Sequence, residues 1–232
     1  MPQKRPNILL IVTDQHNYRT LGSYEGERGE PVDTPTLDRL SENSATFENA
    51  YCSAPVCAPS RLSFLSGRRV PNAGAWGNHS VLRPGLDTLP QTLSDAGYET
   101  GLVGKMHLGG SRQYVGFDHR PYGDLTGKAG HQLEPPDPNW DLDLRSFVTD
   151  VGKTNVPESL TQDRTVAEES TAFVREHRAK DDAEPFFLCA SFNRPHWPRT
   201  IPERFFDRYW PDGTPEPRTS GAERIDHPLL DF

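Results

Sequence analysis

Residues 186–192 read Phe-Phe-Leu-Cys-Ala-Ser-Phe, and this short apolar run is typical of a strand that is buried on both faces of a sheet. A helical segment precedes it from Thr161, with Val166 and Phe173 on one stripe and Pro185 at its end. A long amphipathic helix followed by a buried strand is the repeating unit of a parallel α/β sheet.

The same alternation recurs towards the amino terminus. Residues 7–13 form an apolar, β-branched run, and residues 98–103 form a second predicted strand that follows a predicted helix. Residues 34–44 predict a further helix, with Thr34 as its cap, and residues 46–51 alternate well enough to predict a strand. We therefore expect an α/β fold with a mostly parallel central sheet flanked by helices.

Length and composition favour one domain. The chain has 232 residues, enough for a single α/β domain over residues 1–232 with a long irregular insertion at about 110–160. The net charge of −8 argues against nucleic-acid binding by phosphate neutralisation. The apolar run at residues 7–13 is too short for a membrane span or a signal-peptide core, which predicts a cytoplasmic protein without a membrane partner.

Cysteine usage gives no disulfide framework and no zinc-site spacing, because the chain holds only three cysteines. Cys52 and Cys189 lie in predicted strands, so we expect both to be buried, inert thiols. Cys57 stands apart because of the residues that follow it.

Polar side chains follow the predicted strands, at the point where each strand ends. Asp14 follows the first, Lys105 and His107 follow the second, and Arg194 and His196 follow the third. Ligands of open α/β sheets bind at the carboxyl ends of the strands, so we expect these groups to share one crevice. A carboxylate at a strand end is a suitable ligand for a hard cation.

Residues 57–68 read Cys-Ala-Pro-Ser-Arg-Leu-Ser-Phe-Leu-Ser-Gly-Arg. Pro59 suits the first turn of a helix, and the apolar residues behind it continue that helix. The free N–H groups and partial positive charge of a helix N-terminus would favour an ionised group at Cys57, and Arg61 adds a cation one turn further on. The alternative is that Cys57 is a small buried hydrophobe and Arg61 a surface residue.

This stretch resembles the signature of the sulfatase family, Cys-x-Pro-Ser-Arg followed by an apolar helix and Thr/Ser-Gly-Arg. Residues 104–109 match a second signature, Gly-Lys-x-His-Leu-Gly, and Pro195 and His196 resemble the family's Pro-His-x-Pro turn. The first strand of sulfatases ends in Asp-Asp or Asp-Gln, as at Asp14 and Gln15. The resemblance implies an alkaline-phosphatase-like fold and a hydrolase acting on sulfuric esters.

The resemblance also implies a modified nucleophile and a metal ion. In sulfatases a separate enzyme oxidises the cysteine to formylglycine, an aldehyde whose hydrate is the nucleophile, so Cys57 is the expected site. Asp14, Gln15 and the group at position 57 are the implied ligands of Ca²⁺, with Mg²⁺ or Mn²⁺ as alternatives.

Four more residues receive catalytic roles from the resemblance. Arg61 helps to lower the pKa of the nucleophile, and Lys105 grips a sulfate oxygen. His107 acts as the base when the intermediate collapses, a task that suits the pKa of histidine. His196 donates to a sulfate oxygen or to the leaving group.

The resemblance covers only the amino-terminal half of the family's catalytic domain. Sulfatases are commonly much longer than this chain, and a later Asp-His/Asn-Gly turn and a lysine complete their metal site. Asp226 and His227 are only superficially similar to that turn and are better explained as exposed residues near a chain end.

Three functions therefore stay open. The chain is a fragment or one piece of a sulfatase with a missing carboxyl-terminal portion, a phosphonate monoester or phosphodiester hydrolase of the same superfamily, or a non-catalytic remnant that binds anions or a partner. A truncated sheet would favour self-association. The expected partners of an active enzyme are a small sulfated substrate and the enzyme that modifies Cys57.

Overall fold

The computed structural model describes residues 5–24, 32–123, 151–196 and 199–213. The chain divides into two compact units, Met1–His16 with Phe47–Pro202, and Asn17–Thr46 with Glu203–Phe232. The prediction of one domain with an insertion at about 110–160 stays a prediction. Residues 124–150 of that insertion lie outside the described residues, as do Asp226 and His227.

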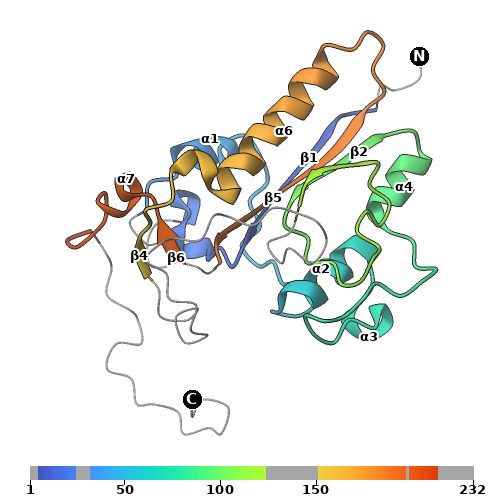
Figure 1. The fold of residues 1–232 in the computed structure, drawn as a ribbon, viewed down its shortest axis with the longest axis horizontal. Helices are drawn as coiled ribbons and strands as arrows, with labels where there is room; N and C mark the ends of the chain where they lie inside the picture. The colour runs from blue at the N-terminus through green and yellow to red at the C-terminus, as the bar shows by residue number, and fades with distance from the viewer. Residues whose placement is uncertain (1–4, 25–31, 124–150, 197–198, 214–232) are drawn as a thin grey trace, which may run out of the picture. The chain divides into compact units, whose positions relative to one another are not determined.

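A four-stranded parallel sheet forms the centre of the first unit (Figure 1). Its strands are β1 (Ile8–Asp14), β2 (Glu99–Gly104), β3 (His119–Tyr122) and β5 (Phe186–Pro195), in the order β1-β5-β2-β3. Every pair of neighbours is parallel. The expected α/β fold is confirmed, and the run at 186–192 occupies the strand between β1 and β2.

Both faces of β5 are buried, as its apolar sequence predicts. Phe187 and Cys189 point into one core cluster, together with Leu62 and Leu65 of α2 (Cys57–Ser66). The alternate residues of β5 pack on the other face against Val166 and other apolar side chains of α6 (Gln162–Arg178). Since successive side chains of a strand point to opposite faces, α2 and α6 cover the two sides of the sheet.

The described part of the first unit also contains α3 (Val70–Ala73), α4 (Leu89–Asp95) and the short η3 (Glu158–Leu160). The hydroxyl of Thr88 caps α4 by accepting from the N–H of Gln91 at 3.3 Å. A separate parallel pair joins β4 (Val151–Lys153) to β6 (Arg199–Ile201).

Two sequence predictions were wrong: the strand at residues 46–51 and the burial of Cys52. Residues 46–51 form no strand, and Phe47 and Tyr51 are 74% and 90% exposed. Cys52, which follows them, is exposed rather than buried. Residues 46–51 alternate between apolar and polar side chains, but among the described residues they pair with no strand. Alternation alone does not form β-structure without a neighbouring strand.

The second unit contains η1 (Tyr18–Thr20), η2 (Gly22–Tyr24), α1 (Pro35–Ser41) and α7 (Glu203–Phe206). Thr34 precedes α1, but its hydroxyl makes no backbone cap and donates instead to the Asp38 carboxylate at 2.8 Å. No helix in the described ranges has both the length and the apolar character to cross a bilayer.

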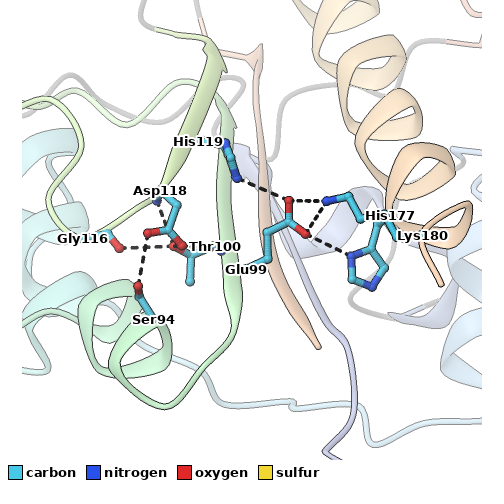
Figure 2. Close-up of polar contacts among 8 residues, drawn as sticks. All are labelled: Ser94, Glu99, Thr100, Gly116, Asp118, His119, His177 and Lys180. Atoms are coloured by element: carbon cyan, nitrogen blue, oxygen red, sulfur yellow. Dashed lines mark hydrogen bonds and ion pairs between the residues drawn. The ribbon is translucent and has the colours of Figure 1, made fainter. Parts of the chain in front are cut away.

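Polar contacts tie the amino end of β2 to its neighbours (Figure 2). Both carboxylate oxygens of Glu99 accept from Lys180 Nζ at 2.8 Å, and each also lies 3.3 Å from a histidine, His177 of α6 or His119 of β3. Beside it, the Asp118 carboxylate accepts from the N–H of Thr100 at 3.0 Å. These contacts lie at the end of β2 opposite to Lys105.

Candidate active site

Three side chains from different elements converge at the carboxyl ends of β1 and β5. Asp14 is the last residue of β1, His196 follows β5, and Cys57 is the first residue of α2. One potential ligand atom from each lies within 4.8 Å of the others. Asp14 and His196 are buried and Cys57 is half-buried, so this Asp14–Cys57–His196 cluster has one partly open member.

The backbone changes direction sharply beyond β1 and β2. Gln15 has a φ of 61° and His107 a φ of 55°, a left-handed conformation that non-glycine residues seldom adopt. Such strained residues gather at functional sites, where the surrounding structure holds them in place. Gln15 directly follows Asp14, and His107 lies two residues after Lys105, so both are near the charged residues of the site.

Two buried cations surround the carboxylate of Asp14. Lys105 Nζ forms a close ion pair with Oδ2, and a guanidinium nitrogen of Arg61 lies 3.4 Å from the same oxygen. Burial by itself would raise the pKa of Asp14, but the contact and charge of Lys105, with the charges of Arg61 and His196, hold that pKa below its usual value. The carboxylate is therefore ionised over the whole physiological pH range.

Arg61 is buried, so the alternative prediction that it is a surface residue was wrong. The terminal guanidinium nitrogen that does not face Asp14, Nη1, donates both to the backbone carbonyl of Lys105 at 2.6 Å and to Ser191 Oγ at 3.0 Å. The side chain is 4% exposed. Arg61 thus links α2, one turn beyond Cys57, to the residue that follows β2 and to the middle of β5.

Cys57 lies at the entrance of α2, as the sequence predicts. The N–H of Ala58 belongs to the first turn of α2 and has no acceptor within the helix, and it donates to Asn78 Oδ1 at 3.1 Å. At the other end of α2, Gly67 adopts the left-handed conformation that commonly ends a helix. The thiol of Cys189, in contrast, has its pKa raised to about 12 by burial, and the prediction that it is buried is confirmed.

The structure adds three positioning residues that the sequence analysis did not assign. Ser191 binds Arg61, and Asn193 accepts from Lys105 Nζ at 3.1 Å. The carboxylate of Asp163, in the first turn of α6, accepts from the backbone N–H groups of Asn193 and Arg194 at 2.7 and 3.0 Å. Asn193 directly follows the predicted strand and Asp163 begins the predicted helix, so their places were visible but their partners were not.

The structure does not test the roles of the two remaining predicted site residues. His107 follows β2 but is not one of the three clustered residues. Gln15 lines a neighbouring cavity together with Arg194. The roles assigned to these residues from the family resemblance stay predictions.

The carboxylate of Asp14 is the member of the Asp14–Cys57–His196 cluster that is best suited to bind a divalent cation. Oδ2 of that residue is buried and has no hydrogen bond of good geometry among the described residues, although the two cations lie at ion-pair distance. Such an oxygen suits a hard cation, whereas the Cys57 sulfur and the His196 ring are softer donors. Oxidation at position 57 would exchange that sulfur for oxygen.

Similarity to known proteins agrees with this geometry. Residues 6–219 match the family model described as Sulfatase. The chain is 33% identical to an arylsulfatase of Clostridium perfringens, over 92% of this chain and 48% of that protein. The chain spans 41 to 48% of the length of three curated relatives that it matches.

Solved structures share the fold. One is described as a complex with its substrate D-glucosamine-2-N,6-O-disulfate; it superposes with a TM-score of 0.69 at 24% identity, over 93% of this chain and 40% of the other. A phosphonate monoester hydrolase of Agrobacterium radiobacter superposes with a TM-score of 0.66 at 21% identity, over 91% of this chain and 45% of the other. With the family model spanning nearly the whole sequence, the chain belongs to the sulfatase family.

Proposed function

We propose that the protein to which this chain belongs hydrolyses sulfuric esters and releases inorganic sulfate from a small sulfated alcohol. The observation that carries the proposal is the convergence of Cys57 with Asp14 and His196, next to the buried cation Lys105. A sulfate ester presents negatively charged oxygens around an electrophilic sulfur, so it requires a nucleophile surrounded by donors and cations.

Each residue of this chain has a specific task in the proposal. Lys105 and His196 donate to the sulfate oxygens and orient the ester, because both belong to the buried group around Asp14. His107 accepts a proton from the group at position 57 during product release. Arg61 positions Cys57 and Lys105 through its hydrogen bonds and does not contact the substrate.

Two additional components belong to the proposal. Oxidation of Cys57 to formylglycine by a separate modifying enzyme would supply an oxygen nucleophile, and a Ca²⁺, Mg²⁺ or Mn²⁺ ion held by Asp14 would favour its ionised form. Support comes from the suitable carboxylate oxygen of Asp14 and from the half-buried position of Cys57, which leaves it reachable.

The mass of the peptide that contains Cys57 tests the modification directly. Conversion of the thiol to formylglycine lowers the mass by about 18 Da, because one oxygen replaces the sulfur and two hydrogens are lost. The peptide that contains Cys189, a buried thiol, is the internal control and should keep its mass. An unmodified Cys57 in protein isolated from its native cell would contradict the formylglycine mechanism.

A second candidate is a phosphonate monoester or phosphodiester hydrolase. It is favoured by the structural similarity to a phosphonate monoester hydrolase and by the Asp14-Gln15 strand end. Parallel assays of phenyl sulfate, phenyl phenylphosphonate and diphenyl phosphate separate the candidates, because the preferred ester has the highest kcat/KM. Turnover of none of them by the modified, metal-supplied whole protein would favour the non-catalytic remnant.

A further inference from the structure

A cavity of about 380 Å³ is lined by residues that are adjacent in sequence to two members of the Asp14–Cys57–His196 cluster. Gln15, which follows Asp14, lines it, and so does Pro195, which precedes His196. The other lining residues are Arg194, Arg199 and Ile201. Its volume is near the lower end of the range of small-molecule sites, which runs from roughly 300 to 1,000 Å³.

The charge of this lining is one-sided. Of the five described residues that line it, two are arginines and none is acidic, in a chain whose net charge is −8. Arginine is the residue best suited to bind a carboxylate or a sulfate, because its planar guanidinium offers two parallel donors. The side chains of Pro195 and Ile201 add apolar surface against which a carbon skeleton can pack.

Arg194 is held in place without being fully buried. Its Nε donates to the carbonyl of Thr200 at 3.1 Å, and a terminal nitrogen lies 3.7 Å from the carboxylate of Asp163. The side chain remains 18% exposed. A guanidinium that is already oriented loses less conformational freedom when it binds an anion.

Arg199 reaches the cavity from a different element. It is the first residue of β6, where it pairs with Val151 of β4. The N–H of Thr154 also donates to the carbonyl of Ile201 at 2.9 Å, which fixes the other end of β6. The side chain of Arg199 is exposed and is thus open to a ligand that enters from solvent.

We propose that this cavity binds a second anionic group of the substrate, a carboxylate or a further sulfate on the same carbon skeleton. The inference rests on the proposed function, because it takes the scissile ester to lie at the Asp14–Cys57–His196 cluster. It narrows the substrate class to sulfated alcohols with an additional negative charge, and it predicts discrimination against alcohols whose only charge is the ester.

Matched esters test this selectivity. Phenyl sulfate carries one anionic group, and 3- and 4-carboxyphenyl sulfate carry a second at two distances from the ester. The whole protein should hydrolyse at least one carboxylated ester with a kcat/KM about tenfold above that for phenyl sulfate, the size expected for one charge-assisted contact. The preference should weaken as salt is added, because salt screens the charges.

Single charge deletions assign the effect to the cavity. Arg199→Gln should lower the ratio of the two kcat/KM values about tenfold, and Arg199→Glu should lower it further. Arg178→Gln, which removes the same charge at the carboxyl end of α6, should leave the ratio unchanged. A ratio that is near one in the unaltered protein, or that Arg199→Gln does not change, would overturn the proposal.

Binding without turnover separates this inference from the proposed function. Benzenesulfonate and 3- or 4-sulfobenzoate resemble the esters but cannot be hydrolysed, so calorimetry reports their affinities alone. Tighter binding of a sulfobenzoate that Arg199→Gln abolishes, in a protein that hydrolyses no sulfate ester, would support the cavity and contradict the activity. Hydrolysis of the esters by a protein that binds benzenesulfonate and the sulfobenzoates equally well would support the activity and contradict the cavity proposal.

Discussion

The ammonium group of Lys105 connects Asp14, at the end of β1, to Asn193 of β5. Its Nζ pairs with Asp14 and donates to Asn193 Oδ1 at 3.1 Å, and the side chain is buried. A buried ion pair contributes little net stability as a pair, but removal of one partner leaves an uncompensated charge. Lys105 therefore fixes both the position and the ionisation of Asp14.

Replacement of Lys105 by Met removes the charge and keeps most of the stem. We expect Lys105→Met to lower the free energy of unfolding by about 3 kcal/mol near neutral pH. Burial raises the pKa of Asp14 and the Lys105 contact and charge lower it, with a lowered pKa as the result. The stabilisation is thus present above the unfolded-state pKa and is lost as the pH falls through the folded-state pKa.

Urea unfolding between neutral and acidic pH measures this effect. The difference between the unaltered protein and Lys105→Met should shrink in acid, when the Asp14 carboxyl is protonated. The control is Lys180→Met, which removes an ion pair whose lysine side chain is 50% exposed and should cost no more than about 1 kcal/mol. A difference that does not depend on pH would contradict the assignment to Asp14.

At the scale of elements, the site depends on the close approach of β2 to β5. Gly104, the last residue of β2, has a φ of 93°, and a Cβ built on it would lie 2.1 Å from the carbonyl oxygen of Ser191. The next residue, Lys105, donates its N–H to that same oxygen at 2.9 Å. A side chain at position 104 would push apart the two strands that carry Lys105 and Asn193.

Two glycine substitutions separate backbone strain from this steric conflict. Gly104→Ala should destabilise the protein by more than about 3 kcal/mol, because it combines a positive φ with a clash against backbone. Gly67→Ala, at a φ of 63° with nothing within 4 Å, meets the strain alone and should cost about 1 kcal/mol. Denaturant unfolding of both variants checks the order, and equal losses would show that the clash relaxes.

The elements that could be predicted are those with a long, apolar pattern. β1, β2 and β5 supply apolar runs, and α6 supplies a clear stripe. The apolar run of β1 predicts a buried strand, but Leu9 and Ile11 are 52% and 56% exposed, so the prediction of burial on both faces was wrong for β1. β3 reads His-Arg-Pro-Tyr, and its four residues carry no alternation that marks a strand. β4 and β6 have only three residues each, so their pairing depends on tertiary contacts that no local pattern encodes.

At the scale of the whole molecule, the end of the sheet opposite to the site has its own electrostatic tie. Glu99 joins β2 to α6 and β3 through Lys180, His177 and His119 (Figure 2). Burial raises the pKa of Glu99, but its contacts with Lys180 and His177 and the charges of Lys180 and His119 hold the pKa below the usual value. The tie thus persists in mildly acidic solution.

Glu99→Gln is expected to lower the stability of the first unit by about 1 kcal/mol near pH 6. Because the folded-state pKa of Glu99 is depressed, its contribution is present above the unfolded-state value, 4.5, and is lost as the pH falls through the folded-state pKa. Thermal unfolding at pH 6 and below pH 4 measures the loss. Glu184→Gln, which breaks an exposed pair with Arg5, is the control and should change little.

The candidate site was predictable to the extent that it depends on strand ends. Parallel strands place Asp14, Lys105 and His196 at one edge, and the motif places Cys57 at a helix entrance beside them. The supporting contacts of Ser191 were not predictable, because they depend on the register in which β5 pairs with β1 and β2. Register follows from packing of the complete sheet and not from any single segment.

Arg61 has a consequence for the energy of reaction as well as for structure. Its guanidinium holds the carbonyl of Lys105 and the hydroxyl of Ser191 in the folded chain, before any ligand binds. Water must reorient its dipoles each time charge develops on a reacting group, and that reorganisation raises the barrier. Dipoles and charges fixed by folding have no such rearrangement to make, so under the proposed function Arg61 would keep Lys105 in the position that the reaction needs before the substrate binds.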